Sequence, residues 1–249
     1  MDSTVTVIAV GAVVAGFVQG LSGFAFGLVA MSIWAWSVEP RLAASLAVFG
    51  ALTGQVIAAV TVRRGFDWGR LTPFLAGGLV GVPIGLWLLP RLDVPLFKAF
   101  LGTLLVVWCP AMLAAARLPR VTAGGRVGDV LAGTAGGVMG GVGGFAGAVP
   151  TLWCLLRGFE RDAARAVVQN FNLAMLSVAF IGYLASGFVT LAMAPLLGLV
   201  AVAVLVPVLL GARVYIGLSE QAFRRIVLVL LTLSGIALLV SSLPVLLAR

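Results

Sequence analysis

The chain has 249 residues, of which 62% are hydrophobic and 10% are charged, and its formal net charge is +8. A soluble domain carries roughly 25% charged residues, so this composition excludes a soluble fold and indicates a polytopic membrane protein. The lysines and arginines lie in short clusters beside apolar segments, which is typical of membrane topology signals rather than of nucleic-acid binding. The expected surroundings are therefore a lipid bilayer, and no nucleic-acid partner is expected.

The residues needed for most enzymatic chemistry are missing from the sequence. There is no histidine, and the acidic residues fall near the ends of apolar segments or in loops. Neither a histidine-based metal site nor a buried carboxylate relay can be assembled from this set. Cys109 and Cys154 lie in apolar surroundings without metal-ligand spacing. We therefore expect no enzymatic activity, no metal and no cofactor.

Apolar stretches follow one another along the chain, and most have the ~20 residues that one helical crossing needs. They cover approximately residues 5–37, 42–62, 71–90, 95–116, 127–156, 166–185, 191–212 and 222–247. The first and fifth are longer and carry a glycine cluster near the middle, so they are too long for one upright crossing and too short for two. They are predicted to be glycine-broken pairs of half-helices that re-enter the membrane, or alternatively short tilted crossings.

The two glycine clusters are copies of one another. Residues 16–25 align with residues 137–146, so that Gly16, Gly20 and Gly23 match Gly137, Gly141 and Gly144, and both segments end in Phe-Ala. Further matches continue as far as Phe97-Lys98 in the first half and Phe223-Arg224 in the second. Duplicated halves with interrupted apolar segments are typical of transporters. The sequence predicts an all-α integral membrane protein of two inverted repeats, residues 1–120 and 126–249, each with one broken or re-entrant segment and three transmembrane helices.

The distribution of positive charge predicts the orientation. If both broken segments return to their own face, twelve cations share one face, and only Arg41, Arg91, Lys98 and Arg249 lie opposite. If every stretch crosses once, the cations divide nine to seven between the two faces, and this difference is too small for the positive-inside rule to identify the cytoplasmic face. The re-entrant arrangement is therefore favoured. It places the cation-rich face in the cytoplasm and both termini in the periplasm.

The glycine clusters are also the first candidates for a binding site. A half-helix that begins there turns its free N–H groups and its positive end toward the membrane centre, where they suit an anion. Proline is tolerated in the first turn of a helix but not in its interior, so Pro150 predicts that the second half-helix begins nearer Gly147. Close helix packing is the alternative explanation for the glycines, as interhelical hydrogen bonding is for the buried amides. The predicted substrate-binding residues are Gln19, Gly20, Ser22, Gly23, Phe24, Gln55, Gly141, Gly143, Gly144, Phe145, Gln169, Asn170 and Asn172.

Four charged residues are candidates for auxiliary roles. Arg41 and Arg165 are placed to present positive charge at the cavity mouths, where it attracts anions. Glu39 and Glu160 occupy matching positions after the two glycine clusters and are candidates for proton coupling. Pairing of these glutamates with nearby arginines is the favoured explanation.

The chain resembles a known family in several motifs. These are the doubled glycine cluster, the run from Gly137 to Pro150 followed by an alanine-rich helix from Ala163, and the segment from Gly81 to Gly85. Over essentially the whole chain they resemble the sulfite exporter TauE/SafE family. The resemblance implies a multi-pass protein of the bacterial inner membrane that moves sulfite, thiosulfate, sulfoacetate or a related small anion.

From these features we expect a secondary transporter, in the direction of export, that works by alternating access around a central site between the repeats. A passive anion channel and a non-transporting membrane scaffold subunit are the alternatives. The expected partners are a small anionic substrate and the bilayer, and a homodimer is compatible with this class.

Overall fold

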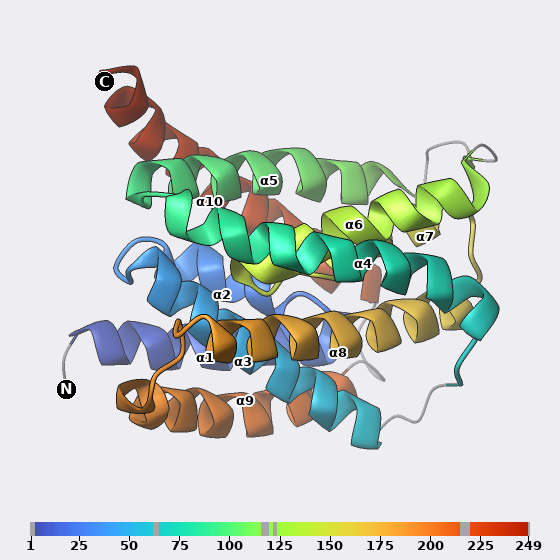
Figure 1. The fold of residues 1–249 in the computed structure, drawn as a ribbon, viewed down its shortest axis with the longest axis horizontal. Helices are drawn as coiled ribbons and strands as arrows, with labels where there is room; N and C mark the ends of the chain where they lie inside the picture. Colours follow the sequence, from blue (N-terminus) through green and yellow to red (C-terminus); the bar gives the residue numbers. More distant parts are fainter. Residues whose placement is uncertain (1–2, 62–64, 116–119, 122–123, 215–219, 249) are drawn as a thin grey trace.

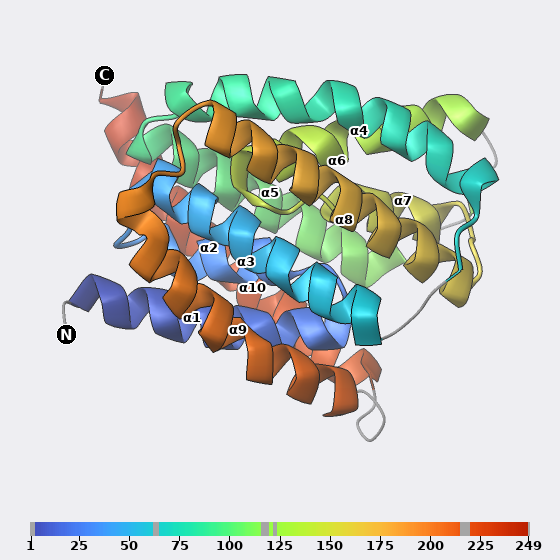
Figure 2. The ribbon, with the colours of Figure 1, turned by 60° about the horizontal axis from the view of Figure 1, so that its bottom comes forward.

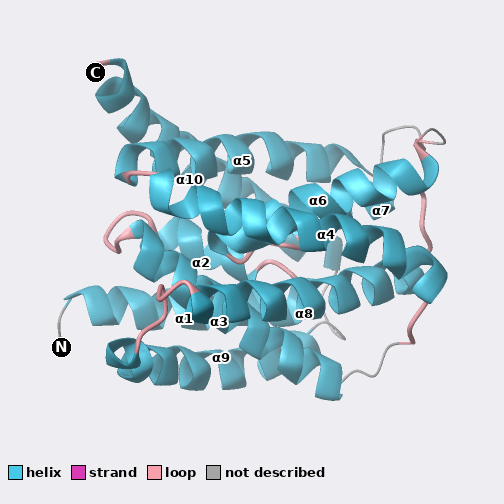
Figure 3. Ribbon diagram, viewed as in Figure 1, coloured by secondary structure: helices cyan, strands magenta, loops and turns pink. Residues whose placement is uncertain are grey.

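The computed structural model describes residues 3–61, 65–115, 120–121, 124–214 and 220–248. These residues form helices and connecting loops, without a strand (Figures 1 and 3). Seven of the described helices, counted with short flanking turns, are long and apolar enough to cross a membrane. Met1, Arg63, Arg64, Arg117 and Arg249, which contributed to the predicted orientation, lie outside the described residues.

Each half of the chain follows the same order of elements, a broken pair of helices and then three long ones. The first half contains α1 (Ser3–Ser22), α2 (Phe26–Trp34), α3 (Pro40–Thr61), α4 (Trp68–Leu88) with the short η1 (Leu89–Arg91), and α5 (Val94–Ala114). The second half contains α6 (Gly125–Gly143), α7 (Ala148–Leu156), α8 (Arg161–Ala185), the short η3 (Leu191–Met193), α9 (Ala194–Val214) and α10 (Glu220–Leu247).

Both long apolar segments break at the aligned glycines. Gly23 separates α1 from α2 with a φ of 83°, and Gly144 ends α6 with a φ of 77°. This left-handed conformation costs any residue with a side chain about 1–2 kcal/mol, which is why glycine stands at both positions. The prediction of glycine-broken segments is confirmed, and α7 begins directly after Gly147.

The short helices α2 and α7 fold back toward the ends of the molecule from which α1 and α6 start (Figure 1). The indole Nε1 of Trp34, at the end of α2, donates to the carbonyl oxygen of Val7 near the beginning of α1 at 3.2 Å. The two breaks meet in the middle of the molecule, because a methyl group on Gly27 would lie 2.6 Å from the carbonyl oxygen of Gly144. The N-terminal ends of both short helices therefore lie near the centre.

The two halves are interleaved rather than side by side (Figure 2). Helix α1 packs against α9 of the other half, and its counterpart α6 packs against α4. These crossings are close: a methyl on Gly20 would collide with the carbonyl oxygen of Val208, and one on Gly141 would lie 2.6 Å from that of Val82. Small residues allow such backbone contact between membrane helices. Helix packing thus accounts for part of the glycine pattern.

Most of the described cations lie at one end of the molecule, which we call the cation-rich end. The first and last described residues lie at the opposite end (Figure 1). The side chains at the cation-rich end are Arg70, Arg120, Arg126, Arg157, Arg161, Arg165, Arg213 and Arg225, and those near the opposite end are Arg41, Arg91 and Lys98.

Candidate functional site

A cavity of about 510 Å³ lies among the helices, and its lining includes Arg161 and Arg165 of the cation-rich end. Its walls come from the last part of α1 and the first break, from α3, α5, α7, α8, α9 and α10. Exposed residues such as Thr61 and Arg161 stand at the mouth, and Gly23 to Ala25 of the first break also line the cavity. The cavity therefore joins one face of the protein to the break between α1 and α2.

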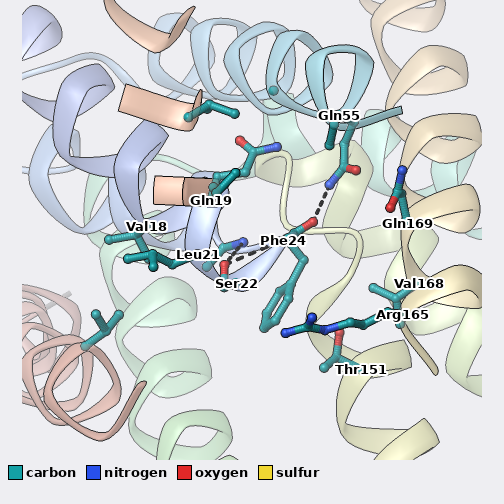
Figure 4. A pocket seen from close by; sticks show the side chains of 18 of the residues that line it. Val18, Gln19, Leu21, Ser22, Phe24, Gln55, Thr151, Arg165, Val168 and Gln169 are labelled. Carbon is teal, nitrogen blue, oxygen red and sulfur yellow. Dashed lines mark hydrogen bonds between the residues drawn. The ribbon is translucent and has the colours of Figure 1, made fainter. Parts of the chain in front are cut away.

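The first break presents its backbone to this cavity. Gly23 is exposed, and a methyl group added there would meet no other atom within 4 Å. Gln55 on α3 donates from Nε2 to the carbonyl oxygen of Gly23 at 2.6 Å. The Ser22 hydroxyl oxygen accepts from the backbone N–H groups of Phe24 at 3.4 Å and Ala25 at 3.2 Å. Figure 4 shows these bonds beside the cavity.

Amide side chains surround the break. Gln19 donates from Nε2 to the carbonyl oxygen of Ala51 at 3.0 Å. Because Gln19 and Gln55 both reach carbonyl oxygens, their nitrogens must be the bonded atoms, and their Oε1 atoms are left buried without a partner. Leaving a buried polar atom unpaired costs about 1–3 kcal/mol, so such groups are rare in native structures. Gln169 of α8 lines the same cavity opposite Gln55 (Figure 4).

The charge of the cavity is positive. Arg161 and Arg165 line it, and no acidic residue does so among the described residues. Figure 4 shows the Arg165 side chain extending from α8 toward Phe24 and Thr151. Apolar side chains form most of the remaining wall, including Phe24 and Trp108, whose rings meet edge to face at 5.8 Å. A positive cleft with low-dielectric walls concentrates anions.

The second break is closed in this conformation. Gly143, Gly144 and Phe145 are buried and do not line the cavity. A methyl group on Gly144 would lie 3.0 Å from backbone atoms of Ala47 and Val48 in α3. The sequence suggested that both glycine tips face a cavity, and the packing of α3 over Gly144 explains why only Gly23 does so here.

The remaining predicted amides lie in different surroundings. Asn170 donates to the carbonyl oxygen of Gly65 at 3.5 Å on the outside of the bundle. Asn172 is buried, with neither amide atom hydrogen-bonded in the described structure. The structure thus brings Gln19, Gly20, Ser22, Gly23, Phe24, Gln55, Gln169 and Arg165 together around one cavity, and it places Gly141, Gly143, Gly144, Phe145, Asn170 and Asn172 outside its lining.

The other charged candidates lie away from the cavity. Arg41 is at the opposite end, where a guanidinium nitrogen donates to the carbonyl oxygen of Pro90 at 3.4 Å. Glu39 accepts from the backbone N–H of Leu42 at 3.0 Å, so its carboxylate caps the beginning of α3. Glu160 is exposed at the N-cap position of α8.

Sequence reasoning missed several residues. Asp129 is 5% exposed, although it lies near a segment end, and its carboxylate accepts from Trp153 Nε1 at 2.8 Å and lies 3.8 Å from Arg157. Arg161 was not among the predicted cavity residues, yet it lines the cavity with Arg165. Their spacing of one helical turn was the available signal, because residues four apart share a helix face.

The described residues contain no group of three histidine, cysteine or acidic side chains that could hold a metal ion.

Comparison with known proteins identifies a matching family. A family model described as "Sulfite exporter TauE/SafE" matches residues 8–238, from within α1 to within α10. No curated protein and no solved structure matches the chain.

Proposed function

Because the chain belongs to the sulfite exporter TauE/SafE family, we propose that it is a secondary carrier that exports a small sulfur-containing anion such as sulfite, sulfoacetate or thiosulfate. Membership of this family implies transport of sulfite or related sulfur anions across a membrane, and the family is one of transporters rather than enzymes. The observation that carries the finer proposal is the cavity that is lined by two arginines and by the break at Gly23.

The anion enters past Arg161 and Arg165 and binds against the break. The positive end of α2 begins there, and the absence of a side chain at Gly23 lets an anion approach the backbone. The Ser22 hydroxyl and the Gln169 amide both line the cavity and supply further hydrogen-bond donors. These groups recognise oxygen atoms, which sulfite and sulfonates share.

The cavity supports a carrier more than an open channel because no residue of α2 lines it. Helix α2 lies beyond the break, and Phe26 and Trp34 within it are fully buried against each other, with ring centroids 6.2 Å apart. In the proposed alternate state this seal opens, and the matching break at Gly144 lines a cavity at the other end. Inverted repeats support such exchange between two states.

The proposed orientation follows the positive-inside rule. The cation-rich end lies in the cytoplasm of a bacterium, and both termini lie in the periplasm. The cavity then opens to the cytoplasm, which is the side from which an exporter loads its substrate.

Ligand-induced stabilisation tests the proposed substrate class. Purified protein is heated with sulfite, thiosulfate, sulfoacetate, taurine or simple carboxylates. A bound ligand at 100 times its Kd stabilises the fold by about 2.7 kcal/mol, so a true substrate raises the melting temperature in a saturable way. Stabilisation by sulfite or a sulfonate but not by carboxylates supports the proposal. The absence of stabilisation by every sulfur anion contradicts it.

A further inference from the structure

Asn172 stands out among the described residues because both atoms of its amide are buried without a partner. The residue is 1% exposed, and neither Nδ2 nor Oδ1 is hydrogen-bonded in the structure. Its near neighbour Asn170 has a backbone partner at the surface. Most buried polar groups are satisfied, and an exception of this kind requires an explanation such as an absent ligand.

The amide of Asn172 lies against the beginning of α7. A methyl group on Gly147, the N-cap residue of this nine-residue helix, would lie 2.6 Å from Nδ2 and 2.8 Å from Oδ1 of Asn172. The N-terminus of α7 is near the centre of the molecule. A helix N-terminus carries partial positive charge and favours an anion. An unpaired donor and this positive end therefore meet at one point.

This point lies next to the lining of the cavity but outside it. Arg161, Arg165 and Val168 line the cavity from α8, and Asn172 follows Val168 one turn deeper on the same helix face. Phe24 lines the cavity, and its Cβ lies 2.9 Å from the methyl position on Gly147. Phe24 therefore stands between the cavity and the beginning of α7.

We propose that Asn172 and the N-terminus of α7 form a second, deeper subsite for the substrate, reached from the cavity past Phe24. This inference rests on the proposed function. A side-chain amide offers a donor nitrogen and an acceptor oxygen, and a singly protonated sulfur oxyanion such as hydrogensulfite offers the complementary pair. Nδ2 donates to a charged oxygen, and Oδ1 accepts from the protonated oxygen. A fully ionised sulfonate satisfies Nδ2 alone.

The test measures exchange of labelled sulfite by the full-length protein in liposomes, together with its melting temperature. Asn172→Leu replaces the amide by an apolar group of similar size, and Asn170→Leu is the matched control on the outer face. We expect Asn172→Leu to melt at or above the wild-type temperature, because an unpaired buried amide has been removed, while sulfite exchange falls at least tenfold. The control should exchange sulfite within twofold of the wild type.

The outcomes separate this subsite from the proposed function. A folded Asn172→Leu protein that exchanges sulfite within twofold of the wild type overturns the subsite alone. If leucine prevents folding, Asn172→Ala replaces it under the same criterion. In the wild type, methanesulfonate should compete with labelled sulfite at least tenfold less well than unlabelled sulfite, which is in rapid equilibrium with hydrogensulfite, and equal competition contradicts recognition of the proton. No sulfite exchange by the wild type overturns the proposed function and the subsite together.

Discussion

The amide nitrogen of Gln55 on α3 donates to the carbonyl oxygen of Gly23 at 2.6 Å, across the break between α1 and α2. The last carbonyl groups of a helix have no partner within the helix, and at membrane depth few alternatives exist. Gln55 therefore ties the conformation of the break to the position of α3. The same helix covers the second break through Ala47 and Val48, so α3 contacts both.

Replacement of Gln55 should loosen the first break. Gln55→Leu leaves the Gly23 carbonyl without its partner, and we expect a loss of about 0.5–1.5 kcal/mol in stability together with weaker sulfite binding. Thermal unfolding with and without sulfite measures both effects. Thr53→Val on the same helix removes only a bond to Phe49 within α3 and should change either quantity little. Unchanged stability and sulfite affinity in Gln55→Leu would show that this bond does not hold the break.

The two aligned glycines should respond differently to alanine. Gly23→Ala incurs the left-handed backbone cost of about 1–2 kcal/mol but meets no neighbour, so the protein should fold and bind sulfite more weakly. Gly144→Ala incurs the same backbone cost, and its methyl also presses on the backbone of α3. We expect a larger loss of thermal stability at Gly144. Equal melting temperatures for the two variants would mean that Gly144 is not packed as the structure places it.

Glycines in the helix crossings should control assembly rather than binding. A side chain on Gly137 would collide with the carbonyl oxygen of Gly78 in α4, whereas one on Gly198 of α9 would meet nothing within 4 Å. Overpacking costs about 1–3 kcal/mol or more where backbones cannot separate. Gly137→Val should therefore lower the yield of monodisperse protein in size-exclusion chromatography, and Gly198→Val should not. A normal elution profile and yield for Gly137→Val would contradict the assigned crossing.

Much of the fold could be predicted from the sequence because glycine and apolar patterns act locally. The broken segments follow from the glycine clusters and segment lengths, and the beginning of α7 follows from Pro150, which lacks the N–H that a helix interior requires. The sequence could not predict that the first break lines the cavity whereas the second is buried. Gly23 and Gly144 occupy aligned positions, and what distinguishes them is whether α3 lies over them, which is a tertiary contact.

The different surroundings of the amide side chains also could not be predicted from residue type alone. Gln55, Asn170 and Asn172 are all neutral and all lie within apolar segments. Gln55 nevertheless contacts the first break, Asn170 lies at the surface, and Asn172 contacts the beginning of α7. Asp129 was assigned to a segment end, and it is buried because Trp153 and Arg157 return to it from α7. Such partners are distant in the sequence and meet only when the second broken segment folds back.

The arginines at the cavity mouth should raise the local concentration of anions. We expect Arg165→Gln to increase the KM for sulfite roughly three- to tenfold, with a smaller effect on the maximal rate and a weaker dependence on salt. Arg126→Gln, at the same end but outside the cavity lining, is the control for a general effect of charge. Initial transport rates over a range of sulfite and salt concentrations provide the measurement. Equal effects of both substitutions would remove a local role for Arg165.

The proposed orientation can be tested by labelling single cysteines in intact cells. Cys109 and Cys154 are buried and can be replaced by alanine to give a silent background. A cysteine at Arg120 should be protected from an impermeant reagent added outside, and one at Ser186, exposed at the opposite end, should react. External labelling at Arg120 together with protection at Ser186 would reverse the assignment of cytoplasm and periplasm.

Counterflow tests the central claim, transport of a sulfur anion by alternating access, most directly. Liposomes containing the purified protein are loaded with unlabelled sulfite and diluted into a trace of labelled sulfite. The account predicts that internal sulfite accelerates entry of the label and makes it accumulate transiently, because one rearranging site carries anions in both directions. Entry that is independent of internal sulfite would indicate a channel. Label uptake no greater than in protein-free liposomes would contradict transport altogether.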